Sequence, residues 1–186
     1  MAAAILEGYL LMTDWQRVVS EHSDAVRQTA WRLVGNEADA ADCLQEAFMA
    51  AVKVSRNRRV RNWRGLLKVL ATRRALDKLR SRFRESSRSD SLPDWSAVAS
   101  TAPGPVQAAE AAELAARIRS ALPELPAAQA EAFCLRHLDD LSYRQIAAEL
   151  DMKTSAVGVL LHRARARLRD ILLDAPQPLA ERCCNE

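Results

Sequence analysis

The sequence predicts an all-α protein made of two small helical domains joined by a flexible linker, with a helix-turn-helix in the C-terminal domain. Three observations support this fold class. Only 5% of the 186 residues are aromatic, and the abundant alanine, leucine and arginine favour helices over strands. Apolar residues recur at steps of three and four along most of the chain. The stretch 86–104 interrupts this period with serine and proline, which is typical of a linker.

Two helices are predicted at the start of the N-terminal domain. Apolar residues form one stripe over 14–34, and His22 lies on it, so we expect a hydrogen-bonded core histidine there. Gly35 should end this helix, because glycine adopts the left-handed conformation of a helix end. Asn36 should cap the next helix, over about 37–54.

The second helix has two distinct faces. One carries the apolar residues Ala41, Leu44, Phe48, Ala51 and Val52. The other is polar and acidic at three- and four-residue steps, and carries Asp39, Asp42, Gln45, Glu46 and Met49. Acids near a helix start are favoured by the helix dipole, so a plain solvated face is one interpretation of this pattern, and a protein-docking face is the other.

A basic block follows. Between Lys53 and Arg88 there are fourteen Lys or Arg and two acids. The block contains a loop over 55–61 and a long helix from residue 62 to about 84. One side of that helix reads Arg64, Lys68, Ala71, Ala75, Lys78 and Arg82. Alanines between cations let a phosphate backbone approach closely, so this side predicts a nucleic-acid contact.

The opposite side of the long helix is predicted to be buried and consists of Leu66, Val69, Leu70, Leu76 and Phe83. Arg73 lies on this apolar side near Asp77, so we expect those two residues to form an ion pair. Trp63, at the helix start, has two interpretations. It packs into the core, or it stacks on an unpaired base, an interaction that contributes about 1–3 kcal/mol.

The C-terminal domain is predicted to hold helices over 105–121 and 126–137, followed by the helix-turn-helix over 141–172. Ser142 should cap the first helix of this motif, and Asp151 should take a left-handed conformation in the turn. The core stripe of the second helix is Val157, Leu160, Leu161, Ala164, Leu168 and Ile171. A small turn followed by a helix with a basic outer face is typical of DNA-binding motifs, although a hairpin of helices that only packs is the alternative.

The second helix of the motif turns a mixed set of residues outward: Ser155, Gly158, Val159, His162, Arg163, Arg165, Ala166 and Arg169. Val159 is an apolar residue on a charged surface, and Gly158 costs about 1 kcal/mol of helix propensity relative to alanine. A groove contact explains both, because Gly158 permits close approach and Val159 can touch a thymine methyl group. The alternative is that Val159 packs on the preceding helix or on a partner protein.

Other classes of function lack support. His22, His137 and His162 lie on separate predicted helices, and no nucleophile, paired-carboxylate or zinc spacing is present, so we expect no enzyme activity, no metal and no cofactor. The N-terminal residues lack the basic start of a signal peptide and are too few to span a membrane. With Cys43 and Cys134 inside helices, a reduced cytoplasm is the expected location.

Three stretches resemble extracytoplasmic-function (ECF) sigma factors of RNA polymerase. DAADCLQEAF, at 39–48, is similar to the D-A-x-D-x-x-Q-E-x-F signature of sigma region 2. GLLKVLATRRALDKLR, at 65–80, resembles the segment that binds the promoter's minus-ten element. LSYRQIAAEL, at 141–150, with LHRARARLR, at 161–169, resembles the region that binds the minus-thirty-five element.

The resemblance implies a transcription initiation factor that binds core RNA polymerase and promoter DNA. In this family an anti-sigma factor is often a further partner. The implied polymerase contacts are Asp39, Asp42, Gln45 and Glu46. The implied minus-ten contacts are Arg56, Arg58, Arg59, Arg61, Trp63, Arg64, Lys68, Lys78 and Arg82. The implied minus-thirty-five contacts are Arg144, Lys153, Thr154, Ser155, Gly158, Val159, His162, Arg163 and Arg165.

The expected organisation is an N-terminal extension at 1–13, a region 2-like domain at 14–85, a linker at 86–104, a region 4-like domain at 105–174 and a tail at 175–186. The alternative function is a helix-turn-helix regulator that binds duplex operators without polymerase. That alternative accounts for the C-terminal half and leaves the acidic face and the basic helix without a role.

Overall fold

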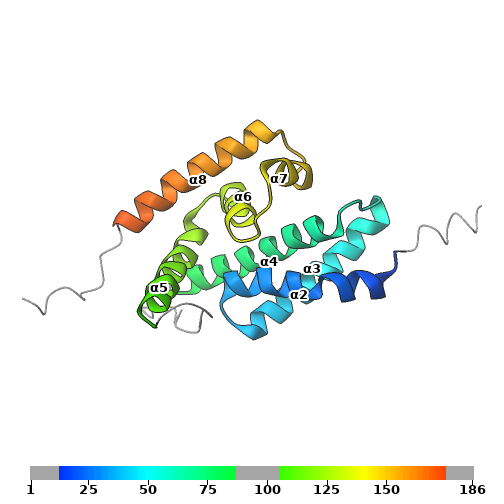
Figure 1. Cartoon of the computed structure of the whole chain (residues 1–186), viewed down its shortest axis with the longest axis horizontal. Coiled ribbons are helices and arrows are strands. Elements are labelled where there is room, and N and C mark those ends of the chain that lie inside the picture. The colour runs from blue at the N-terminus through cyan, green and yellow to red at the C-terminus, as the bar shows by residue number, and fades with distance from the viewer. Residues whose placement is uncertain (1–12, 87–104, 175–186) are drawn as a thin grey trace, which may run out of the picture.

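The structure, a computed structural model, describes residues 13–86 and 105–174, and every regular element within these ranges is helical (Figure 1). The elements are α2 (Trp15–Val34), α3 (Glu37–Asn57), α4 (Trp63–Ser86), α5 (Pro105–Ala121), a 3-10 turn η1 (Leu122–Glu124), α6 (Ala127–His137), α7 (Tyr143–Glu149) and α8 (Thr154–Asp174). The all-α prediction is confirmed. The expected linker, N-terminal extension and tail, with Cys183 and Cys184, lie almost wholly outside the described residues.

The helix boundaries of the N-terminal half follow local chemistry. The Asp14 carboxylate accepts a hydrogen bond from the backbone N–H of Arg17 at 3.1 Å and caps α2. Gly35 ends α2 with φ 75°, a conformation that glycine adopts without steric cost. Asn36 caps α3 by accepting from the N–H of Asp39 at 2.9 Å. The predictions for Gly35 and Asn36 are confirmed.

The helices α2, α3 and α4 pack around a core rich in small residues. Ala47 and Ala51 of α3 meet Val26 of α2 and Leu67 and Ala71 of α4, and all five are almost fully buried. Alanine lets helix axes approach closely, because no bulky side chain separates the two backbones. This cluster holds α4 in the groove between α2 and α3.

The central helix α4 is covered on more sides than the sequence predicted. In Figure 1 it runs through the middle of the molecule, with α2 below it, α3 rising from below toward its first turn, and α6, α7 and α8 above. The expectation of an open phosphate-binding side is wrong for three residues: Ala71 and Ala75 are fully buried, and Lys68 is 8% exposed. The neighbouring helices cover Ala71 and Ala75, and the turn between α6 and α7 covers Lys68.

The two halves of the chain share apolar cores. Leu76 and Leu79 of α4 pack in one cluster with Leu122 of η1 and Cys134 of α6. A second cluster joins Val69 of α4 to the helix-turn-helix core. A fully buried leucine contributes about 1.5–3 kcal/mol relative to an exposed one, so this contact stabilises the observed arrangement substantially.

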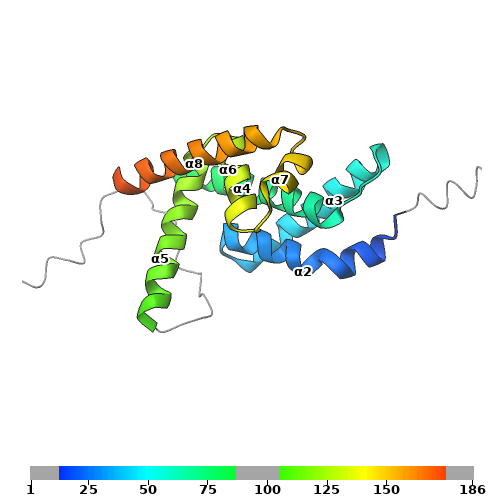
Figure 2. The ribbon, with the colours of Figure 1, turned by 45° about the horizontal axis from the view of Figure 1, so that its top comes forward.

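The helix-turn-helix forms as predicted from the sequence. Ser142 caps α7 in a reciprocal capping box with Gln145. Asp151 takes the left-handed conformation, with φ 52°, in the turn before α8. Val157 and Leu161 are fully buried, while Leu160, predicted as core, is only partly buried. Figure 2 shows α5 steeply inclined to α8 at the far end of the motif.

Several sequence expectations fail because of tertiary contacts. Arg73 pairs with Glu131 of α6, with Nε–Oε1 at 2.5 Å, and not with Asp77, which lies 3.6 Å from Arg80.

The final turn of α3 reaches Asn57, so the basic loop is shorter than expected and Arg56 is helical.

Three further residues differ from expectation in their exposure. Phe83, expected to be buried, and Ala41, on the apolar face of α3, are exposed. His22, expected in the core, is half-buried at the edge of a pocket.

Cys43 and Cys134 are buried free thiols, as expected. Burial raises the pKa of Cys43 to about 11 and raises that of Cys134 further above its ordinary value. Both thiols therefore remain protonated near neutral pH and pack as small apolar groups. No helix in the described parts of the chain is long and apolar enough to cross a membrane.

Candidate functional site

The acidic face of α3 lies at the surface, as its spacing predicts. Gln45 is exposed, and the side chains of Asp42 and Glu46 are 61% and 50% exposed. Asp39 is more enclosed, at 22%, because it is also the third residue of the helix and lies against α4. These four residues form a continuous strip, since steps of three and four residues fall on one side of a helix.

Cations of α4 hold this acidic strip in place. Lys78 Nζ lies 2.9 Å from both Asp39 Oδ1 and Asp42 Oδ2. Arg82 pairs with Asp39 and donates to the carbonyl of Val34 at 3.0 Å. Lys78 and Arg82 were expected to bind phosphates, but in this structure they neutralise and orient carboxylates. Both side chains remain partly exposed.

Arg74 is a further member of this cluster that the sequence did not single out. Its Nε lies 3.5 Å from Glu46 Oε2, and both side chains are about half exposed. An ion pair with this much solvent exposure contributes little to stability, because water screens the attraction between its charges. The signal that identifies Arg74 is its place on α4, one helical turn before Lys78.

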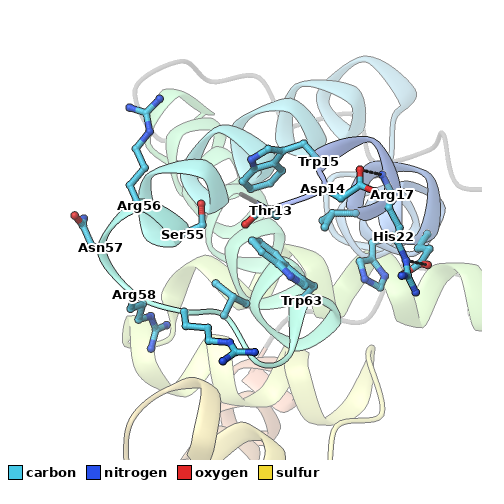
Figure 3. Close-up of a pocket in the computed structure, with 14 residues that line it drawn as sticks. Thr13, Asp14, Trp15, Arg17, His22, Ser55, Arg56, Asn57, Arg58 and Trp63 are labelled. Atoms are coloured by element: carbon cyan, nitrogen blue, oxygen red, sulfur yellow. Dashed lines mark hydrogen bonds and ion pairs between the residues drawn. The ribbon is translucent and has the colours of Figure 1, made fainter. Parts of the chain in front are cut away.

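The basic loop borders a cavity of about 810 Å³ between the end of α3 and the start of α2 (Figure 3). The loop arginines Arg58 and Arg59 line it, together with Arg56 from the last turn of α3. In Figure 3 the Arg56 side chain points away from the protein, and all three arginines are exposed. The cavity therefore has a cationic rim, which suits an anionic backbone passing over it.

Two tryptophans form one wall of this cavity. Trp15 of α2 and Trp63 of α4 meet edge to face, with ring centroids 5.1 Å apart and planes at 73°. Both rings are partly exposed and line the cavity. An aromatic surface beside arginines is suited to stacking an unpaired base. The sequence pointed to Trp63 and missed Trp15, because only the fold brings position 15 beside position 63.

The other predicted minus-ten residues lie in different surroundings. Arg61 and Arg64 are exposed. Lys68 is buried in an ion pair with Asp139, with Nζ–Oδ1 at 3.1 Å. The structure thus brings the loop arginines and Trp63 together and separates Lys68 from them.

The outer face of α8 is open. Val159 is 49% exposed, and the remaining residues predicted to face outward are exposed or partly exposed: Ser155, Gly158, His162, Arg163, Arg165, Ala166 and Arg169. Val159 is therefore not buried against the preceding helix, and about half of its surface is open to a ligand. Lys153 and Thr154 are exposed where α8 begins, and Arg144 is exposed on α7 beside the basic loop.

Gly158 faces open space apart from one neighbour. A Cβ built there meets Tyr143 Cε2 at 4.0 Å, an ordinary van der Waals distance. The protein's own packing therefore does not require glycine at this position. Tyr143 is also near Arg165, with the hydroxyl 3.5 Å from Nη2, and its ring lies 5.9 Å below the guanidinium of Arg136.

The two arginines near Tyr143, Arg136 and Arg165, also affect the pKa of a histidine, His137. Burial lowers the pKa of His137 from its ordinary value of 6.5, and the nearby charges of Arg165 and Arg136 lower it further. Tyr143, Arg136 and His137 add aromatic and cationic groups beside the open face of α8. Sequence analysis did not assign them, because they come from α6 and α7 rather than from the basic helix itself.

The described residues contain no group of three or more histidines, cysteines or acids arranged to hold a metal ion. What the geometry supplies is recognition: an acidic strip, a cationic cavity with exposed aromatic rings, and an open helix face of mixed polarity. Such surfaces bind macromolecules through charge, stacking and base-edge contacts.

Comparison with known proteins gives the same picture in both halves of the chain. The family described as "Sigma-70 region 2" matches residues 18–85, and the family described as "Sigma-70, region 4" matches residues 115–168. The first match contains the acidic strip and the basic helix, and the second contains the helix-turn-helix.

Curated relatives align over most of the chain. The ECF RNA polymerase sigma factor SigE of Mycolicibacterium smegmatis is 35% identical over 162 residues, which are 87% of this chain and 62% of SigE. SigW of Bacillus subtilis is 28% identical over 84% of this chain and 88% of its own length. The RNA polymerase sigma-E factor of Streptomyces avermitilis is 30% identical over 86% of this chain and 85% of its own length.

A solved structure shares the fold. The sigma factor RpoE from Bartonella quintana, solved in complex with the anti-sigma factor NepR, superposes with a TM-score of 0.53 and is 22% identical. The match covers 89% of this chain and all of that chain.

Proposed function

The chain belongs to the ECF sigma factors of RNA polymerase, and from this premise we propose that it acts as an alternative sigma factor, which binds core polymerase and directs it to bipartite promoters. Its partners are core RNA polymerase and promoter DNA, in the cytoplasm where transcription takes place. The chain contributes recognition and promoter opening, and the polymerase catalyses RNA synthesis, so the protein is not itself an enzyme.

One observation carries this proposal: a single chain presents an exposed acidic strip within its region 2 match and an open reading helix within its region 4 match. A helix-turn-helix regulator that binds operators without polymerase uses only the second of these surfaces. The region 2 match over residues 18–85 therefore favours the sigma factor over that alternative.

We assign polymerase docking to Asp39, Asp42, Gln45 and Glu46. Exposed carboxylates on one helix face attract a basic surface of a partner and fix its orientation. Lys78 and Arg82 support this face by holding Asp39 from the side of α4. The corresponding domain is 14–85.

The cavity beside the basic loop is assigned to the minus-ten element. Arg56, Arg58, Arg59 and Arg61 supply positive charge to the phosphates of a melted strand, and Trp63 supplies a stacking surface. Arg64 extends this surface along α4. Lys68 belongs to it only in a conformation that exposes its ammonium group.

The open face of α8 is assigned to the minus-thirty-five element, within a second domain at 105–174. Ser155, Gly158 and Val159 lie on the first turns of the helix, the part that enters the major groove in motifs of this class. Arg163 and Arg165 anchor phosphates on either side, with Arg144, Lys153, Thr154 and His162 around them. An anti-sigma factor is a further partner to test, since RpoE of Bartonella quintana was solved with one.

Charge reversal on the acidic strip tests the proposal. The double variant Asp42→Lys/Glu46→Lys is expected to lose co-purification with core polymerase, because two attractive contacts become repulsive. Circular dichroism checks that it stays helical. The matched control is Glu124→Lys/Asp170→Lys, which makes the same change in charge at exposed acids away from the strip.

The control should bind core polymerase as the wild type does. A folded Asp42→Lys/Glu46→Lys variant with wild-type affinity for core polymerase would show that docking occurs elsewhere on the chain.

A further inference from the structure

A second cavity, of about 470 Å³, lies where the basic loop of the N-terminal half meets α7 of the C-terminal half. Small-molecule sites in proteins usually enclose about 300–1,000 Å³, so this volume is sufficient for a ligand. Asn62 and Glu149, which both line the cavity, are joined by a hydrogen bond of 2.7 Å from the Asn62 amide to Glu149 Oε1. Leu66 of α4 and Ala148 of α7 add apolar surface. Both halves of the chain therefore build its walls.

Four arginines line this cavity, which we call the arginine cavity. Three come from the basic loop and one from α7: Arg58, Arg59, Arg61 and Arg144. All four are exposed, and Glu149 is the one acid among the described residues of the lining. Burial raises the pKa of Glu149, and the hydrogen bond from Asn62 and the charge of Arg58 offset part of that rise. Positive charge therefore predominates around the cavity.

The guanidinium groups of these four arginines have no partner within the described parts of the chain. Their side chains form no hydrogen bond and no ion pair there, whereas Lys68, Arg73 and Lys78 are each paired with an acid. Like charges that converge on one space repel one another, and each guanidinium keeps its five N–H donors to offer. An anion in the cavity would relieve this repulsion and accept hydrogen bonds from those donors.

The lining also decides which class of anion fits. Among the described residues that line the cavity none is aromatic, so it offers no ring on which a base could stack, in contrast to the cavity beside Trp15 and Trp63. Guanidinium groups bind phosphate oxygens through two parallel hydrogen bonds. Gln145 adds a neutral donor, because its Oε1 accepts from Ser142 in the capping box and its amide nitrogen has no partner among the described residues. Four cations around one small space match a chain of linked phosphates, which concentrates several negative charges.

We propose that the arginine cavity binds the phosphate chain of a small oligophosphate, either inorganic or carried by a nucleotide. This site goes beyond the promoter surfaces: Arg61 and Arg144 line it and do not line the cavity assigned to the minus-ten element, although Arg58 and Arg59 line both. The loop and α7 hold the ligand together, so its binding stabilises the folded chain by mass action.

Calorimetric titration of the whole chain with sodium tripolyphosphate, and separately with adenosine triphosphate, tests the site in magnesium-free buffer at fixed ionic strength. The variant Arg61→Gln/Arg144→Gln removes one cation from each wall of the arginine cavity and none from the cavity beside the tryptophans. The matched control, Arg84→Gln/Arg167→Gln, removes the same charge at exposed arginines outside the lining. Circular dichroism checks that every variant is folded.

The wild type and the control are expected to bind tripolyphosphate with affinities within about threefold of each other, because water and salt screen exposed charges beyond about 10 Å. Arg61→Gln/Arg144→Gln should bind at least about tenfold more weakly, since two charge-assisted contacts are lost. At one ligand concentration the melting temperature should rise in the wild type and the control, and rise less in this variant.

Glu149→Gln should act in the opposite direction. It removes the negative charge from the lining and keeps an oxygen that accepts the hydrogen bond from the Asn62 amide. We therefore expect several-fold tighter binding of tripolyphosphate. Weaker binding by the folded Glu149→Gln variant would show that the phosphates lie elsewhere on the chain.

The two ligands distinguish the possible sources of the phosphates. Equal affinities would identify the phosphate chain alone as the recognised group, and tighter binding of adenosine triphosphate would identify a nucleotide. No binding by the folded wild type, or equal losses in the two double variants, would overturn the inference. A single-stranded oligonucleotide that binds the same arginines more tightly than either ligand would assign the cavity to DNA and would also overturn it. The titration contains neither polymerase nor promoter, so its outcome is independent of the proposed function.

Discussion

Gly158→Ala separates a requirement of the fold from a requirement of DNA binding. Within a helix, alanine is more favourable than glycine by about 1 kcal/mol. The added Cβ finds a single neighbour within 4 Å, Tyr143 Cε2 at 4.0 Å, so no clash offsets this gain. We expect the free energy of unfolding to rise by about 0.5–1 kcal/mol, with a melting temperature higher by about 1–4 °C.

The effect on DNA should have the opposite sign. If Gly158 lets the helix approach the bases closely, the methyl group should weaken binding of the upstream duplex by about 1–3 kcal/mol, as the loss of one base-pair contact does. Denaturant titration and fluorescence anisotropy measure the two quantities on the same preparation, and core polymerase binding is the internal control. A more stable variant with unchanged DNA affinity would remove Gly158 from the interface, and a less stable variant would refute the packing described for α8.

Two further predictions concern the same region. Val159→Ser should relax the preference at one thymine-containing position of a randomised upstream element, whereas Arg165→Ala should weaken all sequences alike and lower the salt slope by about one; identical sequence logos for wild type and Val159→Ser would exclude a reading role. The lowered pKa of His137 means that the unfolded chain binds its proton more readily, so its contribution to stability is intact above pH 6.5 and lost as the pH falls through the folded pKa. His137→Gln should flatten this acid limb of the stability curve, and an unchanged limb would assign it to other groups.

Features governed by neighbours in sequence were predictable. The left-handed Gly35 and Asp151 and the caps at Asn36 and Ser142 depend on a few adjacent residues, and the structure has all four as expected. The open face of α8 also follows from its period, because one side of the helix is apolar over its whole length.

Features governed by packing between the halves were not predictable. The sequence presents Lys68 on a basic stripe, and nothing nearby in sequence indicates that Asp139, seventy-one positions later, covers it. Arg73 pairs with Glu131 of another helix for the same reason. Trp15 joined the candidate site only through the fold, which places it against Trp63. Patterns along one helix reveal which sides are apolar but not which distant segment covers them.

Run-off transcription tests the central claim most directly. Purified core polymerase is incubated with genomic fragments of the source organism, with and without the chain, and transcript ends are mapped. We predict transcripts of defined start that depend on the chain, preceded by a shared bipartite element, and that disappear with Asp42→Lys/Glu46→Lys. A chain that binds core polymerase yet produces the same transcripts as core polymerase alone would contradict the assignment of this protein as a sigma factor.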